Sequence, residues 1–199
     1  MPSNALERWQ SLTAHRLAVL HRALDHAAPE QLADADARDQ AAQAFVIMLA
    51  AHFQGFCRDL HNECAAEISR YAQSHLPHVA PFVQSRFSEG RKLNQGAANS
   101  STIGSDFGRF TVSFWTLSAV QDPAAAEARR DLDELAELRN ALAHQDFGRT
   151  PDKQPPRFGA EDIRRWWLAC DVLASAMDAA MVEVLVPFEG GASAPTRSK

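Results

Sequence analysis

The sequence predicts an all-α protein, a helical bundle of four long helices with one or two short ones.

 Three observations favour this class. Apolar residues recur at steps of three and four along most of the chain, which is the spacing of one helix face. No alternating strand pattern repeats, and no internal period of roughly 20 to 50 residues is visible, which disfavours sheets and solenoids. With 199 residues and a hydrophobic fraction of 46%, the chain can build one ordinary core. We place that single domain at 1–188 and expect the small, polar tail 189–199 to be disordered.

Two helices are expected in the N-terminal part of the chain. The first begins at Asn4, which stands at capping-box spacing from Glu7, and it ends before Pro29. The second covers about 36–71, with Gly55 as the expected place for a bend. Its apolar stripe consists of Phe45, Leu49, Phe53, Phe56, Leu60, Cys64 and Ile68.

Prolines and small residues divide the middle of the chain. Pro77 and Pro81 end the second helix, and a short apolar patch follows at 82–87. The stretch 89–106 is rich in Gly, Ser, Asn and Ala, so it predicts a loop. The apolar segment 107–117 is compatible with a helix or a strand, and we favour a helix.

Two further helices complete the predicted bundle. Pro123 follows a capping aspartate and opens a helix that ends near His144. A proline-rich loop then leads to the last helix, at about 160–186. Trp167 falls in the core register of this helix. Trp166 could mark a dimer surface or stack a base, and we favour packing against a partner.

Composition narrows the function classes. The chain has 20 Lys and Arg against 25 Asp and Glu, a net charge of −5, so any polyanion must be bound locally. Three cysteines cannot all pair and no Cys-x-x-Cys is present, which indicates a reducing compartment. The N-terminus lacks the pattern of a signal peptide, and no apolar run approaches the roughly 20 residues of a membrane span. We therefore expect a cytoplasmic protein without membrane contact.

The most informative pattern is Arg139-Asn140-x-x-x-His144 at the end of a predicted helix. Asn140 and His144 share a helix face, while Arg139 lies about 140° around from His144. A guanidinium binds phosphate through two parallel hydrogen bonds, and an imidazole transfers protons near neutral pH. RNA supplies its own nucleophile, the 2′-hydroxyl, so this chemistry requires no metal or other cofactor. A structural role stays open, because Arg and His also interact favourably with a helix C-terminus.

This motif, in an all-α chain of this size, resembles the signature of the HEPN superfamily, an Arg and a His separated by four to six residues. The stretches 53–60 and 103–110 resemble the branch named RiboL-PSP-HEPN or the similar MAE-type proteins. The resemblance spans roughly residues 45–186. It implies a helical bundle that forms a homodimer, with the active site of a metal-independent endoribonuclease at the dimer interface.

The resemblance also implies roles for individual residues. Arg139 would bind and polarise the scissile phosphate, His144 would act as general base or acid, and Asn140 would orient one of them or the substrate. One branch is silenced by nucleotidyl transfer onto a tyrosine two residues after the motif histidine. Asp146 occupies that position here and the only tyrosine is Tyr71, so we do not expect that regulation.

A second set of residues concerns RNA binding. Between residues 84 and 110, four cations stand against two acids, and they could line the RNA cleft or belong to an ordinary solvated loop. The four cations are Arg86, Arg91, Lys92 and Arg109.

Histidines and cysteines gather on the second helix. Cys57, His61 and Cys64 share one face, but three ligands from a single helix rarely complete a zinc site, so we expect no metal. Either His52 and His61 assist in the cleft, or they pack beside the apolar stripe; we favour packing.

Two functions from different classes follow. The first is an endoribonuclease of a stress-response, toxin–antitoxin or phage-defence system, with RNA as substrate and an antitoxin or other regulatory protein as a possible partner. The alternative is a non-catalytic HEPN adaptor that binds a partner protein or a nucleotide. The complete Arg-Asn-His motif favours the enzyme, and the acidic net charge favours the adaptor.

Overall fold

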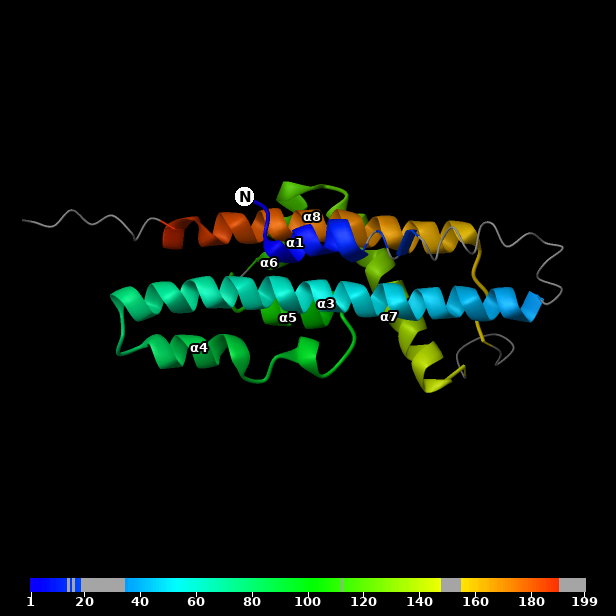
Figure 1. The fold of residues 1–199 in the computed structure, drawn as a ribbon, viewed down its shortest axis with the longest axis horizontal. Helices are drawn as coiled ribbons and strands as arrows, with labels where there is room; N and C mark the ends of the chain where they lie inside the picture. The colour runs from blue at the N-terminus through cyan, green and yellow to red at the C-terminus, as the bar shows by residue number, and fades with distance from the viewer. Residues whose placement is uncertain (14, 16, 19–34, 112, 148–154, 190–199) are drawn as a thin grey trace, which may run out of the picture.

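The computed structural model describes residues 1–13, 15, 17–18, 35–111, 113–147 and 155–189. Within these ranges every regular element is helical, which confirms the predicted all-α class. Three long helices form the frame: α3 (Ala35–His75), α7 (Ala125–His144) and α8 (Ala160–Glu189). Figure 1 shows α3 and α8 side by side along the long axis, with α7 crossing behind α3. None of the described helices is long and apolar enough to cross a membrane.

Six short elements pack around this frame. A single cluster of buried apolar side chains includes residues from most of them and from all three long helices. In Figure 1, α1 lies between α3 and α8, and α4 runs beside the C-terminal half of α3. The short elements are α1 (Asn4–Arg8), the π-helical turn η1 (Trp9–Thr13), α4 (Ala80–Ser88), the 3-10 turn η2 (Lys92–Asn94), α5 (Ser100–Phe107) and α6 (Phe114–Gln121).

The N-terminal half differs from the prediction in two details. The first helix begins at Asn4 as predicted, but its cap is Ser3, whose Oγ accepts the Leu6 N–H at 3.1 Å. The remainder of the predicted first helix, from residue 19 onward, lies outside the described residues. The helix α3 is unbroken at Gly55, where we expected a bend, because Phe53 and Phe56 anchor it in the core on both sides.

The predicted loop at 89–106 was wrong, since this stretch contains η2 and most of α5. A reciprocal capping box starts α5: Asn99 Oδ1 accepts the Thr102 N–H, and Thr102 Oγ1 accepts the Asn99 N–H. Gly104, which suggested a loop, is a packing site. A Cβ at this position would lie 2.7 Å from Nε1 of Trp115.

The C-terminal half follows the prediction more closely. The helix favoured within 107–117 is confirmed from Phe114 onward as α6. The helix α7 begins at Ala125, two residues later than expected, after Asp122 Oδ1 accepts the Ala124 N–H at 2.9 Å. The helix α8 runs three residues beyond the expected Val186, and the predicted tail from residue 190 lies outside the described residues.

Of the two adjacent tryptophans of α8, Trp167 packs against the core as predicted, but the prediction for Trp166 was wrong. Trp166 is 1% exposed, and its ring packs edge-on against that of Phe158 with 5.3 Å between the ring centroids. Trp166 is therefore not available for a partner surface. Trp167 is partly buried, and its ring centroid lies 6.2 Å from that of Phe45. The prediction failed because α8 packs against α3, α6 and α7, which buries a wider face than a single stripe.

Candidate functional site

The predicted catalytic residues lie together in the last six residues of α7. Arg139 Nη1 donates a hydrogen bond to Asn140 Oδ1 at 3.0 Å. The guanidinium therefore bends towards Asn140, which shares a helix face with His144. Arg139 and Asn140 are half-buried, whereas His144 is exposed. The backbone positions of Arg139 and His144 lie about 140° apart around the helix, but the flexible arginine side chain directs its guanidinium towards the side on which Asn140 and His144 lie.

A strained turn follows the motif directly. Gln145 has φ 52° and ψ 31°, and it is the only non-glycine residue with a positive φ among those described. The Asp146 N–H donates to the Ala141 carbonyl at 3.0 Å, which ends the helix sharply after His144. A side chain in this left-handed conformation costs roughly 1 kcal/mol. Backbone strain of this kind is concentrated at functional sites.

The four predicted RNA-binding cations do not form one set. Arg86 and Lys92 are exposed, but Arg109 is only 12% exposed and serves the fold. Its guanidinium donates to the carbonyls of Glu89 at 2.7 Å and Gly90 at 2.9 Å, and also to that of Arg86. Arg109 therefore caps the end of α4, where unpaired carbonyls need donors.

Asp106 organises this segment and was missed by the sequence analysis. Its side chain is fully buried and accepts the backbone N–H groups of Lys92 at 3.0 Å and Leu93 at 2.8 Å. Asp106 also forms an ion pair with Arg109 at 3.4 Å. Sequence patterns gave no signal for it, because its two backbone partners are 14 and 13 residues away.

His61 lies in the same region rather than beside α7. The imidazole is fully buried against Phe107 and Phe110, and Nδ1 is 3.3 Å from Arg91 Nη1. Burial, helped by the charge of Arg91, lowers the pKa of His61 from 6.5 to about 4, so the ring is neutral at pH 7. The side chain is therefore a packed core histidine. His52 is half-buried on α3.

The two cysteines of the candidate zinc set are core residues. Cys57 and Cys64 are buried, and burial raises the pKa of both thiols, to about 12 for Cys64. Zinc binds the thiolate, which this environment disfavours. Across the ranges that the structure describes, no group of three His, Cys, Asp or Glu side chains is placed to hold a metal ion.

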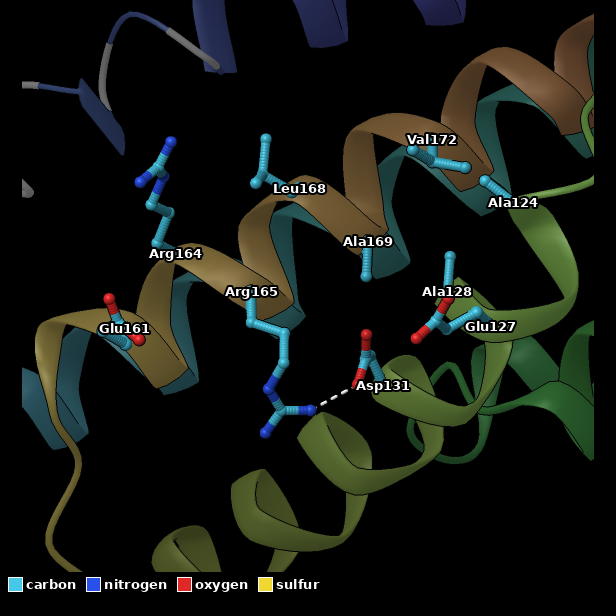
Figure 2. Close-up of a pocket in the computed structure, with 10 residues that line it drawn as sticks. All are labelled: Ala124, Glu127, Ala128, Asp131, Glu161, Arg164, Arg165, Leu168, Ala169 and Val172. Atoms are coloured by element: carbon cyan, nitrogen blue, oxygen red, sulfur yellow. Dashed lines mark hydrogen bonds and ion pairs between the residues drawn. The ribbon is translucent and has the colours of Figure 1, made fainter.

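An open groove of about 360 Å³ lies between α7 and α8 and also escaped the sequence analysis. Figure 2 shows Arg165 reaching across it from α8 towards Asp131 on α7. Arg165 also pairs with Glu134 at 2.7 Å, so these side chains tie the two helices together. Leu168 on the rim is 53% exposed. Sequence patterns could not predict the groove because it arises where two distant helices pack.

The fold and the motif together define an all-α helical bundle with Arg139, Asn140 and His144 at the end of one long helix. Comparisons with models of protein families, with curated proteins and with solved structures find no match. Membership of the HEPN superfamily therefore stays a prediction that rests on the motif and its position.

Proposed function

We propose that the protein is a HEPN-type, metal-independent endoribonuclease that acts in a stress-response, toxin–antitoxin or phage-defence system. The Arg139–Asn140 hydrogen bond carries the proposal, because it turns the guanidinium towards the face that holds His144. The strained Gln145 that follows is further support.

The mechanism uses the side chains of the motif. His144 takes the proton of a 2′-hydroxyl, whose oxygen attacks the adjacent phosphorus. Arg139 stabilises the negative charge that develops on the phosphate oxygens. The bond to the 5′-oxygen breaks, and this oxygen receives a proton, leaving a 2′,3′-cyclic phosphate and a 5′-hydroxyl.

A homodimer supplies the second proton carrier. One imidazole removes a proton while another group must donate one, and a second copy of the motif provides the partner's His144. The exposure of His144 allows this arrangement, since the ring is accessible to another subunit. The two motifs would face each other across the RNA.

The test is cleavage of mixed RNA by purified protein in the presence of a chelator. We expect His144→Ala and Arg139→Ala to lose at least about 100-fold in rate, the scale of general acid–base and electrostatic contributions. The exposed residues His78 and Arg130 provide matched controls, and His78→Ala and Arg130→Ala should cleave like the wild type. Equal cleavage by all folded variants, or a requirement for metal, would contradict the proposal.

A specific observation also favours the adaptor as a second candidate. Arg109 is engaged within the fold, and the groove between α7 and α8 presents the exposed Leu168. A partner helix could place an apolar side chain there. Wild-type protein that is folded by circular dichroism, yet neither cleaves RNA nor retards it in a gel, would favour the adaptor.

A further inference from the structure

A pocket of about 310 Å³ lies between α3, α4 and η2. It is separate from the motif on α7 and from the groove between α7 and α8. Phe87 contributes to its apolar wall, and the polar residues used below are His61, Asn62, Ser69, Arg91 and Asn94. Its volume is at the lower end of the range for small-molecule sites.

Arg91 is the charged group of this pocket. Its Nε and Nη2 donate to Asn94 Oδ1 at 3.2 and 2.8 Å, and its Nη1 donates to Asn62 Oδ1 at 2.6 Å. These acceptors are neutral, and among the described residues no carboxylate pairs with Arg91. The nearby Asp106 is already bound to Arg109 and to two backbone N–H groups. Among the described residues, Arg91 therefore has no carboxylate in direct contact with it, although Asp106 acts on its charge from nearby.

The two asparagines turn hydrogen-bond donors away from the guanidinium. An arginine can only donate, so Asn62 and Asn94 must present their oxygens to Arg91 and direct their NH2 groups elsewhere. In the part of the chain that the structure describes, no hydrogen bond uses these NH2 groups. The Ser69 hydroxyl adds a further donor to the pocket lining. Hydrogen-bond donors beside a cation that has no carboxylate in contact with it are the chemistry of an anion site.

The charges near Arg91 are also compatible with an anion site. Burial lowers the pKa of the Arg91 guanidinium; Asp106 opposes this effect, while the charges of Arg58 and Arg109 add to it. His61 accepts from Arg91 through Nδ1 and is neutral at pH 7, so it leaves the charge of the guanidinium intact. Arg91 is the only charged side chain among the described residues that line the pocket.

We propose that this pocket binds the phosphate group of a small phosphomonoester, with Arg91, Asn62 and Asn94 as the phosphate ligands. A phosphate dianion has enough oxygens to accept from both amides, from a hydroxyl and from the guanidinium N–H that the contacts with Asn62, Asn94 and His61 leave unused. The remaining volume accommodates a group of about the size of a sugar. The same group could be presented by a free sugar phosphate or by the 5′ end of an RNA. The inference does not depend on catalysis at His144.

Binding is measured by calorimetry with ribose 5-phosphate and with ribose, and with an RNA tetramer that carries either a 5′-phosphate or a 5′-hydroxyl. We expect saturable binding of the phosphorylated probes and at least about tenfold weaker binding of their counterparts. Preference among the phosphorylated probes identifies the source, because a free metabolite would favour ribose 5-phosphate and an RNA end would favour the tetramer.

The decisive variant is Asn62→Asp. The new carboxylate keeps the oxygen that accepts from Arg91, but it removes two N–H donors and repels an anion. Phosphate affinity should fall at least about tenfold while the fold is retained. Gln73→Glu makes the same change of charge at an exposed position of α3 outside the pocket and should bind within about twofold of the wild type.

Three results would overturn the inference: no saturable binding of either phosphorylated probe, equal affinity for ribose and ribose 5-phosphate, or unchanged affinity in folded Asn62→Asp. His144→Ala should bind ribose 5-phosphate like the wild type. Loss of RNA cleavage in that variant with retained phosphate binding would therefore separate this pocket from the proposed active site.

Discussion

Asp106→Ala tests the role assigned to the buried carboxylate beneath the segment 89–95. The substitution leaves the Leu93 N–H buried without an acceptor and the Lys92 N–H partly buried without one. An unsatisfied buried donor costs about 1–3 kcal/mol. Arg109, which is 12% exposed, also loses its only carboxylate partner among the described residues. Breaking a buried ion pair costs about 3–5 kcal/mol, and we expect the combined loss in the free energy of unfolding to be at least about 3 kcal/mol.

Urea denaturation followed by circular dichroism measures this loss. The matched control is Asp59→Ala, because Asp59 forms an ion pair with Arg8 while 49% of its side chain is exposed. Surface pairs of this kind contribute at most about 1 kcal/mol. A loss of about 1 kcal/mol or less for Asp106→Ala, similar to that of the control, would refute the assignment. It would also return Arg109 to the set of cations available for RNA.

Three further predictions concern stability. Gln145→Gly should raise the free energy of unfolding by about 0.5–1 kcal/mol in urea, because glycine adopts a φ of 52° without strain; a loss would contradict the strain. The pKa of His61 is lowered to about 4 in the fold, so the unfolded state binds more protons below pH 6.5 and stability falls as the pH decreases from 6.5 to 4; urea titrations across this range should show a weaker fall in His61→Phe. Gly104→Ala should cost about 1–3 kcal/mol, since its Cβ would lie 2.7 Å from Trp115 Nε1, and an unchanged near-UV spectrum and stability would argue against this contact.

Local sequence patterns were sufficient to predict the three long helices and the residues of the proposed active site. The periods of α3, α7 and α8 are repeated over many turns, so their positions could be predicted within a few residues. Arg139, Asn140 and His144 stand within six residues of one helix, so the sequence also determined that they lie close together. Helix geometry alone fixes such neighbours.

The surroundings of the other candidate residues could be known only from the tertiary structure. Asp106, Arg109 and Arg91 are joined to η2, α4 and α3 by contacts between residues far apart in the chain. The burial of Trp166 depends on α8 having neighbours on several sides. A helix period reports one face of one helix, whereas the environment of a charged side chain depends on which distant segments pack around it. The sequence therefore determined the helices and the local motif, and only the packing decided which charges serve the fold and which face a pocket.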